Sequence, residues 1–407
     1  MSNVLFLLGS FYPRASANGN CVWRIAESLQ KRGDKVFCIC EGQNNKKKEM
    51  VSGVEIHYIK GYRQDRMREK GFFCKGIKRR FYVFLERLCA YYRTITTIKH
   101  FPVTKKVADE YYQTIEEICN ENQIDILIPV NKPVDAVCAA VKYKQNNPSV
   151  RLISYMLDLV YGGHYNPLLS KLTERQRCIE TEEQIILHSD KVIALEEHEK
   201  QYTHEHPSAS EDKIYYLGVP LLTDNTRRNP DNNSSGKHTI VYAGSVDERL
   251  RNPLFVAKVF KYIKNAELVM YITDGLEYME SIAKGIANIS IKSRVDATKL
   301  KQIYNQADAF LNIGNATTKQ SPSKIIEFIG YGKPIISTYR IDHDTSAAIL
   351  KDYPNALCID ERSESEKGAA LQIDSFIEHT RPISDFDEIK EKYSRYTPDA
   401  FIDLVMN

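Results

Sequence analysis

The chain has 407 residues, of which 43% are hydrophobic; this is enough for two cores of ordinary size and exceeds one domain of usual length. Its formal net charge of +3 excludes a generally basic nucleic-acid-binding chain, so a basic surface must come from local clustering. Nine cysteines are scattered without a C-x-x-C pair or a Cys/His array, which predicts reduced, mostly buried thiols and no metal site.

The N-terminal residues MSNVLFLLGS contain a short apolar run without a basic leader, so we expect a first strand there rather than a signal peptide. No apolar run reaches the ~18 residues that a membrane-spanning helix needs. We therefore expect a cytoplasmic protein.

The first half of the sequence alternates strand and helix patterns. Residues 4–8 indicate a buried strand, residues 20–32 an amphipathic helix and residues 35–40 the next strand, which together form a βαβ unit. Further strands are expected at residues 54–59, 124–130, 151–156 and 191–195. This alternation predicts a parallel, doubly wound sheet.

Residues 60–106 break this alternation, because basic and aromatic side chains follow one another there with few acidic ones. One interpretation is an inserted helix that packs its aromatic face on the first domain and leaves its basic face in water. The other is a surface that touches an anionic membrane, where aromatic side chains settle at the level of the headgroups. A nucleic-acid surface is less favoured, since nothing else in the chain resembles a base-reading module.

Residues 218–238 are rich in Pro, Asn and Ser, which is typical of a linker. Beyond them, strands separated by helical patterns are expected at residues 239–243, 267–273, 309–313, 334–338 and 356–360. We therefore expect two α/β domains in series, with the first ending at residue 220.

The stretch SPSKIIEFIGYGKPIIST, residues 321–338, predicts a short helix that begins at the carboxyl end of a strand. Ser321 is the expected N-cap, followed by Pro322, and Gly330 and Gly332 end the helix. Open α/β sheets bind their ligands at this edge.

Lys324 and Glu327 share one face of this expected helix. A cation in the first turn opposes the helix macrodipole unless an anion is bound, and the N–H groups around Ser321 and Ser323 add to such an anion site. The spacing suits a nucleotide, with its diphosphate at the helix start and its ribose hydroxyls donating to the glutamate. The alternative is an ordinary ion pair on a solvated surface.

Two loops supply further candidates for phosphate binding. In YAGSVDERLRNP, Arg249 and Arg251 follow Gly244 at the end of an expected strand and could reach the same diphosphate. In GSFYPRASANGNC, Gly19 lies at a helix start, where a bare backbone could approach phosphates. Gly9 and Gly19 are too far apart for the tight turn of a G-x-G-x-x-G motif, which argues against a dehydrogenase.

These motifs resemble the retaining glycosyltransferases of family 4, of the bacterial surface-glycan type, with the GT-B fold. The resemblance covers most of the chain and rests on the Gly19 loop with RGDKV, on YLGVP, on YAGSVDERLRNP, on RVDATKLKQIYNQADAFLNIG and most specifically on SPSKIIEFIGYGKPII. It implies that Glu327 binds the ribose of a nucleotide-sugar and that Arg251 and Lys324 bind its diphosphate.

The resemblance also implies an architecture. It predicts two Rossmann-like doubly wound domains facing a crevice, an acceptor-side domain over residues 1–220 and a donor-binding domain over residues 221–384. Residues 385–407 are then a final helix that crosses back to the first domain. The family needs neither a metal nor a cofactor beyond its donor.

The sequence departs from the family pattern at two places. Lys319 stands where the family has the earlier of two glutamates, so the sugar contacts are expected from Asn315, Lys319 or Gln320 and the donor sugar stays open. Ser245 stands where an arginine often follows the loop glycine, and Arg249 is its expected replacement.

Asp158 and His164, in RLISYMLDLVYGGHYNP, follow the end of an expected strand and resemble the family's first-domain loop beside the reacting sugar. Asp158 is there either a catalytic residue or a turn residue. Retention in this family is usually ascribed to attack on the face of the leaving diphosphate, assisted by the phosphate, so no side-chain base is required.

The sequence therefore predicts an enzyme that moves a sugar from a UDP- or GDP-type donor to a glycan or lipid-linked acceptor, in surface polysaccharide or glycoconjugate synthesis. It is expected in the cytoplasm or peripherally on the inner face of the cell membrane, without a nucleic-acid partner. The alternatives are an epimerase or phosphorylase on the same fold, or a dinucleotide-binding oxidoreductase or non-catalytic nucleotide-binding protein.

Overall fold

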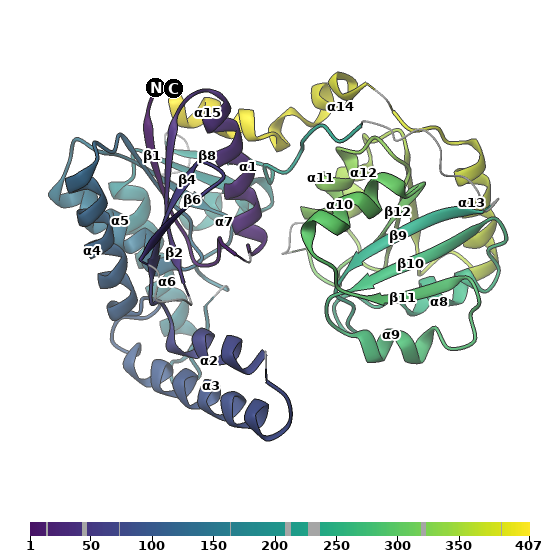
Figure 1. The fold of residues 1–407 in the computed structure, drawn as a ribbon, viewed down its shortest axis with the longest axis horizontal. Helices are drawn as coiled ribbons and strands as arrows, with labels where there is room; N and C mark the ends of the chain where they lie inside the picture. Colours follow the sequence, from purple (N-terminus) through teal and green to yellow (C-terminus); the bar gives the residue numbers. More distant parts are fainter. Residues whose placement is uncertain are drawn as a thin grey trace. The chain divides into compact units, whose positions relative to one another are not determined.

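The computed structural model describes residues 1–407 except 14, 43–46, 73, 163, 208–212, 227–236, 319–322 and 384. The chain divides into two compact units, each with its own sheet (Figure 1). The N-terminal unit comprises Met1–Pro220 and Pro398–Asn407, and the C-terminal unit comprises Leu221–Thr397.

In the described residues, the N-terminal unit has an eight-stranded sheet with the order β3-β4-β2-β1-β5-β6-β7-β8. Its strands are β1 (Asn3–Leu7), β2 (Lys35–Glu41), β3 (Lys48–Val51), β4 (Val54–Ile59), β5 (Ile126–Pro129), β6 (Arg151–Met156), β7 (Lys191–Leu195) and β8 (Ile214–Leu217). All neighbours are parallel except β3 and β4. The strand order reverses between β1 and β5, which makes their carboxyl ends the switch point where ligands bind in such sheets.

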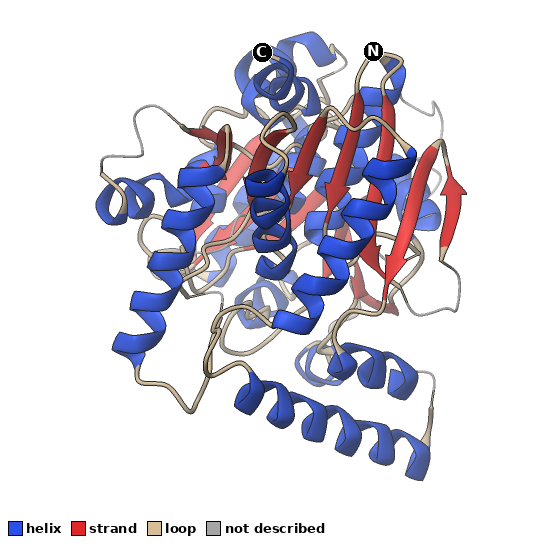
Figure 2. Cartoon of the chain, turned by 90° about the vertical axis from the view of Figure 1, so that its left-hand side faces the viewer, coloured by secondary structure: helices blue, strands red, loops and turns tan. Residues whose placement is uncertain are grey.

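Helices cover this sheet, as Figure 2 shows for the face turned to the viewer. The described helices of this unit are α1 (Ala17–Lys31), α2 (Arg63–Phe72), α3 (Gly76–Thr96), α4 (Lys105–Glu121), α5 (Val134–Asn146), α6 (Lys171–His188), α7 (Glu199–Glu205) and, from the end of the chain, α15 (Pro398–Met406); α2 and α3 lie together at one end of the unit. Tyr155 of β6 packs on Phe401 of α15 with ring centroids 4.6 Å apart, and both side chains are fully buried. The last helix of the chain is therefore part of the N-terminal core.

Among the described residues of the C-terminal unit, six parallel strands form one sheet with the order β11-β10-β9-β12-β13-β14. They are β9 (His238–Gly244), β10 (Ala266–Ile272), β11 (Ile289–Ser293), β12 (Ala309–Ile313), β13 (Ile335–Tyr339) and β14 (Ala356–Asp360). The helices are α8 (Leu254–Phe260), α9 (Leu276–Ile282), α10 (Ala297–Gln306), α11 (Ser323–Ile329), α12 (Thr345–Leu350), α13 (Glu366–His379) and α14 (Phe386–Tyr393). The switch point lies between β9 and β12.

The expected class, two doubly wound parallel sheets, is confirmed. Three strands were not predicted, and each of them ends a sheet: β3, β8 and β11. An edge strand needs no continuous apolar run; β3 and β11 alternate or expose most of their side chains. The single helix expected over residues 385–407 is instead α14, a 3-10 turn and α15, because Pro398 begins a helix and cannot continue one.

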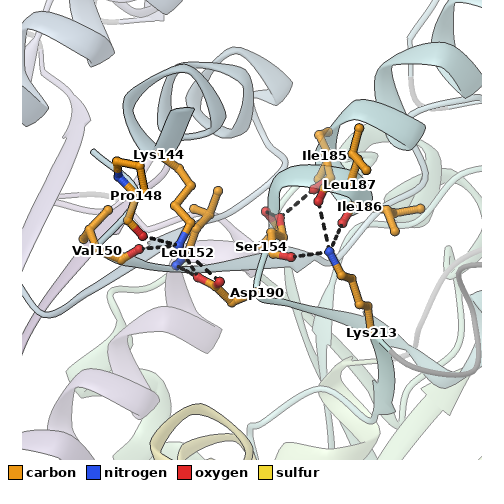
Figure 3. A network of polar contacts seen from close by, with 11 residues as sticks. Lys144, Pro148, Val150, Leu152, Ser154, Ile185, Ile186, Leu187, Asp190 and Lys213 are labelled. Atoms are coloured by element: carbon orange, nitrogen blue, oxygen red, sulfur yellow. Dashed lines mark hydrogen bonds and ion pairs between the residues drawn. The ribbon is translucent and has the colours of Figure 1, made fainter. Parts of the chain in front are cut away.

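Two lysines of the N-terminal unit bind carbonyl groups at or just beyond the C-terminal ends of helices (Figure 3). Lys213 donates to three carbonyls at the end of α6, and Lys144, at the end of α5, donates to two carbonyls and the Asp190 carboxylate. Cations are favourable at helix C-termini, where carbonyls lack partners. These lysines therefore have a structural explanation.

Glu41, at the end of β2, gives the N-terminal unit a pH-dependent stability. Burial, with the negative charges of Asp65 and Asp135, raises its pKa from 4.5 to about 7, although Arg93 opposes the shift. A carboxyl group with a raised folded pKa stabilises below its unfolded pKa and loses that stabilisation as the pH rises through 7.

The wild type should therefore lose stability between pH 4.5 and pH 8 as Glu41 ionises, whereas Glu41→Gln should not. We expect the difference in unfolding free energy between Glu41→Gln and the wild type to rise by about 3 kcal/mol over this pH range, in favour of the variant. Urea unfolding at the two pH values measures this difference. Glu117→Gln, which removes an exposed carboxylate of α4, is the matched control and should show no such gain. Equal pH dependence in wild type and Glu41→Gln would refute the prediction.

Candidate functional site

Arg251 is held at the switch point of the C-terminal sheet by a residue from another strand. Its Nε and Nη2 donate to Oδ1 of Asn315, at 3.0 and 2.8 Å. Arg251 follows β9, whereas Asn315 follows β12 and is only 5% exposed. Because both bonds end on one buried oxygen, the guanidinium has a defined direction before any ligand binds.

The loop that carries Arg251 is shaped by Asp247. The backbone groups of Asp247 and Arg251 exchange two hydrogen bonds, at 3.0 and 3.1 Å. The Asp247 carboxylate also accepts from the N–H groups of Leu250 and Arg249, which lowers the pKa of Asp247. The Arg249 side chain is exposed, and its carbonyl accepts a bond from Arg340 at the end of β13. Arg340 was missed in the sequence because nothing marked the end of β13 as part of this edge.

Lys324 and Glu327 of α11 form an ion pair. Lys324 Nζ lies 2.9 Å from Glu327 Oε2 and 3.1 Å from the Tyr304 hydroxyl. Burial acts to lower the pKa of the Lys324 ammonium, but the Glu327 carboxylate and the Tyr304 hydroxyl outweigh it, and the pKa is raised. The two side chains stay accessible, with 41% and 32% of their surfaces exposed. An incoming anion or hydroxyl can therefore reach both charges.

Tyr304 is the rigid support of this pair. Its ring is fully buried and contacts Phe310 and Phe328 edge to face, at 5.3 and 5.4 Å between centroids. Burial raises the pKa of its hydroxyl to about 12, so the group is a neutral partner for Lys324 at physiological pH. The sequence offered no sign of this role.

A second lysine near α11 is structural. Lys333 Nζ donates to the carbonyls of Tyr304, Asn305 and Ala307, at 2.9, 2.7 and 2.5 Å, and so closes the C-terminal end of α10. Lys324 differs because it lies in the first turn of its helix, where the macrodipole is unfavourable for a cation. Its position is thus not explained by helix stability.

Several predicted site residues lie at the start of α11. Ser323 is its first residue, whereas Lys319, Gln320 and Ser321 lie outside the described residues. Asn315, expected to contact a sugar, instead has its Oδ1 engaged by Arg251. Gly244 ends β9, and a Cβ there would lie 3.6 Å from Nη1 of Arg251.

Gly332, just after α11, serves the fold. Its φ is +66°, and a Cβ there would lie 2.1 Å from the carbonyl oxygen of Ile383. We expect Gly332→Ala to lower the unfolding free energy by about 2 to 4 kcal/mol, since it adds a clash to a strained φ.

Gly285→Ala is the matched control, because Gly285 also has a positive φ, of +80°, but meets no atom within 4 Å. It should cost about 1 kcal/mol, from backbone strain alone. Chemical unfolding of both variants measures the difference, and equal losses would show that the contact with Ile383 is unimportant.

At the switch point of the N-terminal sheet, polar side chains gather around Asp158. Its Oδ2 lies 3.1 Å from Nζ of Lys132 and accepts from Nδ2 of Asn18 at 3.3 Å. The buried Asn131 binds the Asp158 backbone through its side-chain oxygen and nitrogen. Asp158, Lys132 and Asn131 follow β6 and β5, and Asn18 belongs to the first turn of α1.

Two histidines lie near this cluster. Burial lowers the pKa of His164, with added repulsion from Arg93 and Lys132, and its Nδ1 lies 3.1 Å from the Val160 carbonyl oxygen. Burial also lowers the pKa of His198, in the turn after β7. Both rings are therefore neutral at pH 7.

The structure thus brings Asp158 and His164 to one edge, together with residues that sequence reasoning missed: Asn18, Asn131, Lys132 and His198. Listing every polar residue after each expected strand would have found three of these four. Asn18 would not stand out in that way, because a long loop separates it from the end of the first strand.

Gly19 packs against the preceding loop. A Cβ there would lie 2.3 Å from the Ser10 carbonyl oxygen, and the Gly19 N–H donates to the N-cap hydroxyl of Ser16 at 3.1 Å. The glycine is needed for this close packing of α1, whatever ligand it approaches.

Within the described ranges, no three His, Cys, Asp or Glu side chains gather in a way that could hold a metal ion. In the same residues, no helix combines the length and the apolar character that crossing a membrane requires.

Comparison with known proteins gives a fold but no sequence family. No family model and no curated protein matches the chain. Solved structures match it over almost its whole length. They include the glycotransferase of kitacinnamycin, with 14% identity, a TM-score of 0.55 and coverage of 99% of this chain and 98% of that one.

Two further matches have similar values. HepE of Anabaena, in complex with UDP and glucose, has 10% identity, a TM-score of 0.61 and coverage of 100% and 99%. The lipopolysaccharide outer core galactosyltransferase WaaB, in its apo form, has 12% identity, a TM-score of 0.55 and 99% coverage of both chains. At these identities the likeness is one of fold, and the chain has the GT-B fold with its two parallel-sheet domains.

Proposed function

We propose that the chain is a glycosyltransferase that moves a sugar from a nucleoside-diphosphate sugar to a glycan or lipid-linked acceptor. The observation that carries this proposal is the Lys324–Glu327 pair on one carboxyl edge of the C-terminal sheet, together with Arg251, oriented by Asn315. Support comes from HepE, a protein of similar fold that was solved with UDP and with UDP-glucose.

In this proposal the two cations take the diphosphate and Glu327 takes the ribose. Glu327 would exchange its bond to Lys324 for hydroxyl donors of the ribose, and Lys324 would turn to the diphosphate. The fixed guanidinium of Arg251 would stabilise the charge that develops on the departing diphosphate. These cations replace a metal ion as the electrostatic partner of the leaving group, so the proposed reaction is metal-independent.

The N-terminal unit is proposed to bind the acceptor and the reacting sugar. The neutral His164 and His198 can donate or accept hydrogen bonds to sugar hydroxyls, and Asp158, held by Lys132, is the carboxylate next to them. We propose retention of configuration, with the leaving phosphate assisting attack on its own face. Asp158 then orients a hydroxyl and need not act as a base.

We further propose that residues 1–220 form the acceptor-side domain, with residues 221–397 on the donor side. Because Asn315 orients Arg251, we propose that Asn315 is a positioning residue and does not contact the sugar. Lys319 and Gln320 remain the proposed sugar contacts. We propose that the enzyme acts in the cytoplasm, in the synthesis of a surface glycan.

A panel of UDP-, GDP- and ADP-sugars, with NAD as the contrast, tests the proposal by thermal stabilisation. Bound ligand raises the unfolding temperature with the logarithm of its concentration over Kd, so weak donors are also detected. We expect one nucleoside diphosphate series to stabilise the protein. Stabilisation by NAD alone would indicate an oxidoreductase. Turnover without an acceptor, with an epimerised product, would indicate an epimerase, and neither result is compatible with the proposal.

A further inference from the structure

One face of α3 carries large apolar side chains in water. No residue of this helix is buried. The exposed side chains Ile77, Phe81, Phe84, Leu88, Tyr91 and Ile95 follow one another at alternating steps of four and three, so they form one continuous stripe; their exposed fractions lie between 45% and 85%. A stripe of this size is unusual on a solvated helix and marks an interaction surface.

The opposite face of α3 is anchored to the rest of the N-terminal unit. Arg68 of α2 donates to Glu86 of α3 at 2.7 Å, and Arg93 of α3 lies 4.0 Å above the Tyr62 ring. Figures 1 and 2 show α2 and α3 together at one end of this unit, with α3 outermost among the described segments there. The apolar stripe is therefore held facing outward.

The solvent-exposed charged side chains of α3 are all positive. Lys78, Arg79, Arg80 and Arg87 are exposed, and they come from both flanks and the back of the apolar stripe. Glu86 is the acidic residue of α3, and it is turned inward to Arg68. The surface that surrounds the stripe is therefore cationic.

We propose that α3 is an interfacial helix that docks the N-terminal unit on an anionic lipid surface. Phe81, Phe84 and Leu88 would enter the boundary between headgroups and acyl chains, while the flanking lysine and arginines meet the headgroup phosphates. A second copy of the chain is a poorer occupant, because its α3 would bring the same cations and offer no exposed carboxylate to pair with them.

The docked helix adjoins the edge that carries Asp158. Asn166, in the loop after Asp158, donates to the carbonyl of Thr94 in α3 at 2.8 Å, and Arg177 of α6 donates to the carbonyl of Ile98 just beyond the helix. This last step rests on the proposed function: if the chain is a glycosyltransferase, its acceptor is a lipid-linked molecule in the same membrane on which α3 docks.

Vesicle co-sedimentation of the full chain tests the docking. We expect binding to vesicles of phosphatidylcholine with phosphatidylglycerol, weakened by salt, and much weaker binding to pure phosphatidylcholine. Arg80→Ser with Arg87→Ser, which removes two exposed cations on one flank of the stripe, should reduce binding about 25-fold, at about fivefold for each cation. Phe81→Ser with Phe84→Ser should reduce it at least about tenfold.

Matched controls come from the C-terminal unit and from α6. Lys261→Ser with Lys264→Ser removes two exposed cations, and Leu187→Ser with Leu371→Ser removes two leucines that are 61% and 70% exposed. Both should bind as the wild type does. Binding to neither vesicle, binding that ignores salt and lipid charge, or a dimer that Phe81→Ser abolishes without vesicle binding would each overturn the proposal.

The same experiments separate docking from catalysis. The α3 variants should keep their stabilisation by the nucleoside diphosphate, and Lys324→Ala should keep vesicle binding. Loss of vesicle binding in Lys324→Ala would contradict docking through α3.

Discussion

Glu327→Ala and Lys324→Ala are expected to lower kcat/KM for the nucleotide-sugar by about 100-fold or more while the protein stays folded. Glu327 would lose two charge-assisted bonds to the ribose, and Lys324 the charge that meets the diphosphate. Glu327→Gln keeps the shape but not the charge and should lie between the wild type and Glu327→Ala. Steady-state kinetics with the donor found in the panel measure these losses.

The chain contains a matched control for this prediction. Arg24 and Glu27 of α1 form another pair three residues apart, at 3.0 Å and with exposures of 33% and 41%, close to the values of Lys324 and Glu327. If the α11 pair only stabilised its helix, Arg24→Ala and Lys324→Ala would have the same small cost, well below 1 kcal/mol, and equal turnover. Wild-type turnover in both Lys324→Ala and Glu327→Ala would remove these residues from the site.

The fold could be predicted from the sequence because its central strands are buried on both faces. Strands such as β1 and β12 appear in the sequence as short apolar runs, and in the intervening helices apolar residues recur every three to four positions. The edge strands β3, β8 and β11 could not be predicted in this way, since packing and pairing rather than an apolar run define them. Residues 60–106 were expected to form either a helix with its aromatic face packed on the first domain or a membrane-touching surface. The aromatic face of α3 is exposed instead of packed, and this orientation depends on contacts with α2 that spacing does not reveal.

The candidate site was predictable where its residues are close in sequence. Lys324 and Glu327 are one turn apart, so spacing alone placed them on one face. Lys132 and Asp158 meet only because parallel strands β5 and β6 end at the same edge. Tyr304 meets Lys324 for a similar reason, through the packing of α10 and α11. Contacts of this kind can be predicted only when the order of the strands and the packing of the helices are known.

Arg251→Ala is expected to lower kcat by about 100- to 1000-fold, because it removes a fixed cation from the leaving diphosphate. Arg251→Lys should rescue little of this loss. A guanidinium can donate two bonds to Asn315 and still direct its remaining N–H groups at the diphosphate, whereas the smaller ammonium of lysine cannot do both. Asn315→Ala should cost about tenfold or more in kcat by releasing the guanidinium from its direction.

A double-mutant cycle decides whether Asn315 acts through Arg251. If it does, Asn315→Ala costs little once Arg251 is already alanine, and the two losses do not multiply. Asn355, a buried asparagine of the same unit that binds the Gly332 and Arg381 carbonyls, is the control. Asn355→Ala should lower the unfolding temperature and combine multiplicatively with Arg251→Ala. Multiplicative losses for Asn315 as well would show that its role is only structural, because a side chain that supports the fold alone has no reason to depend on Arg251.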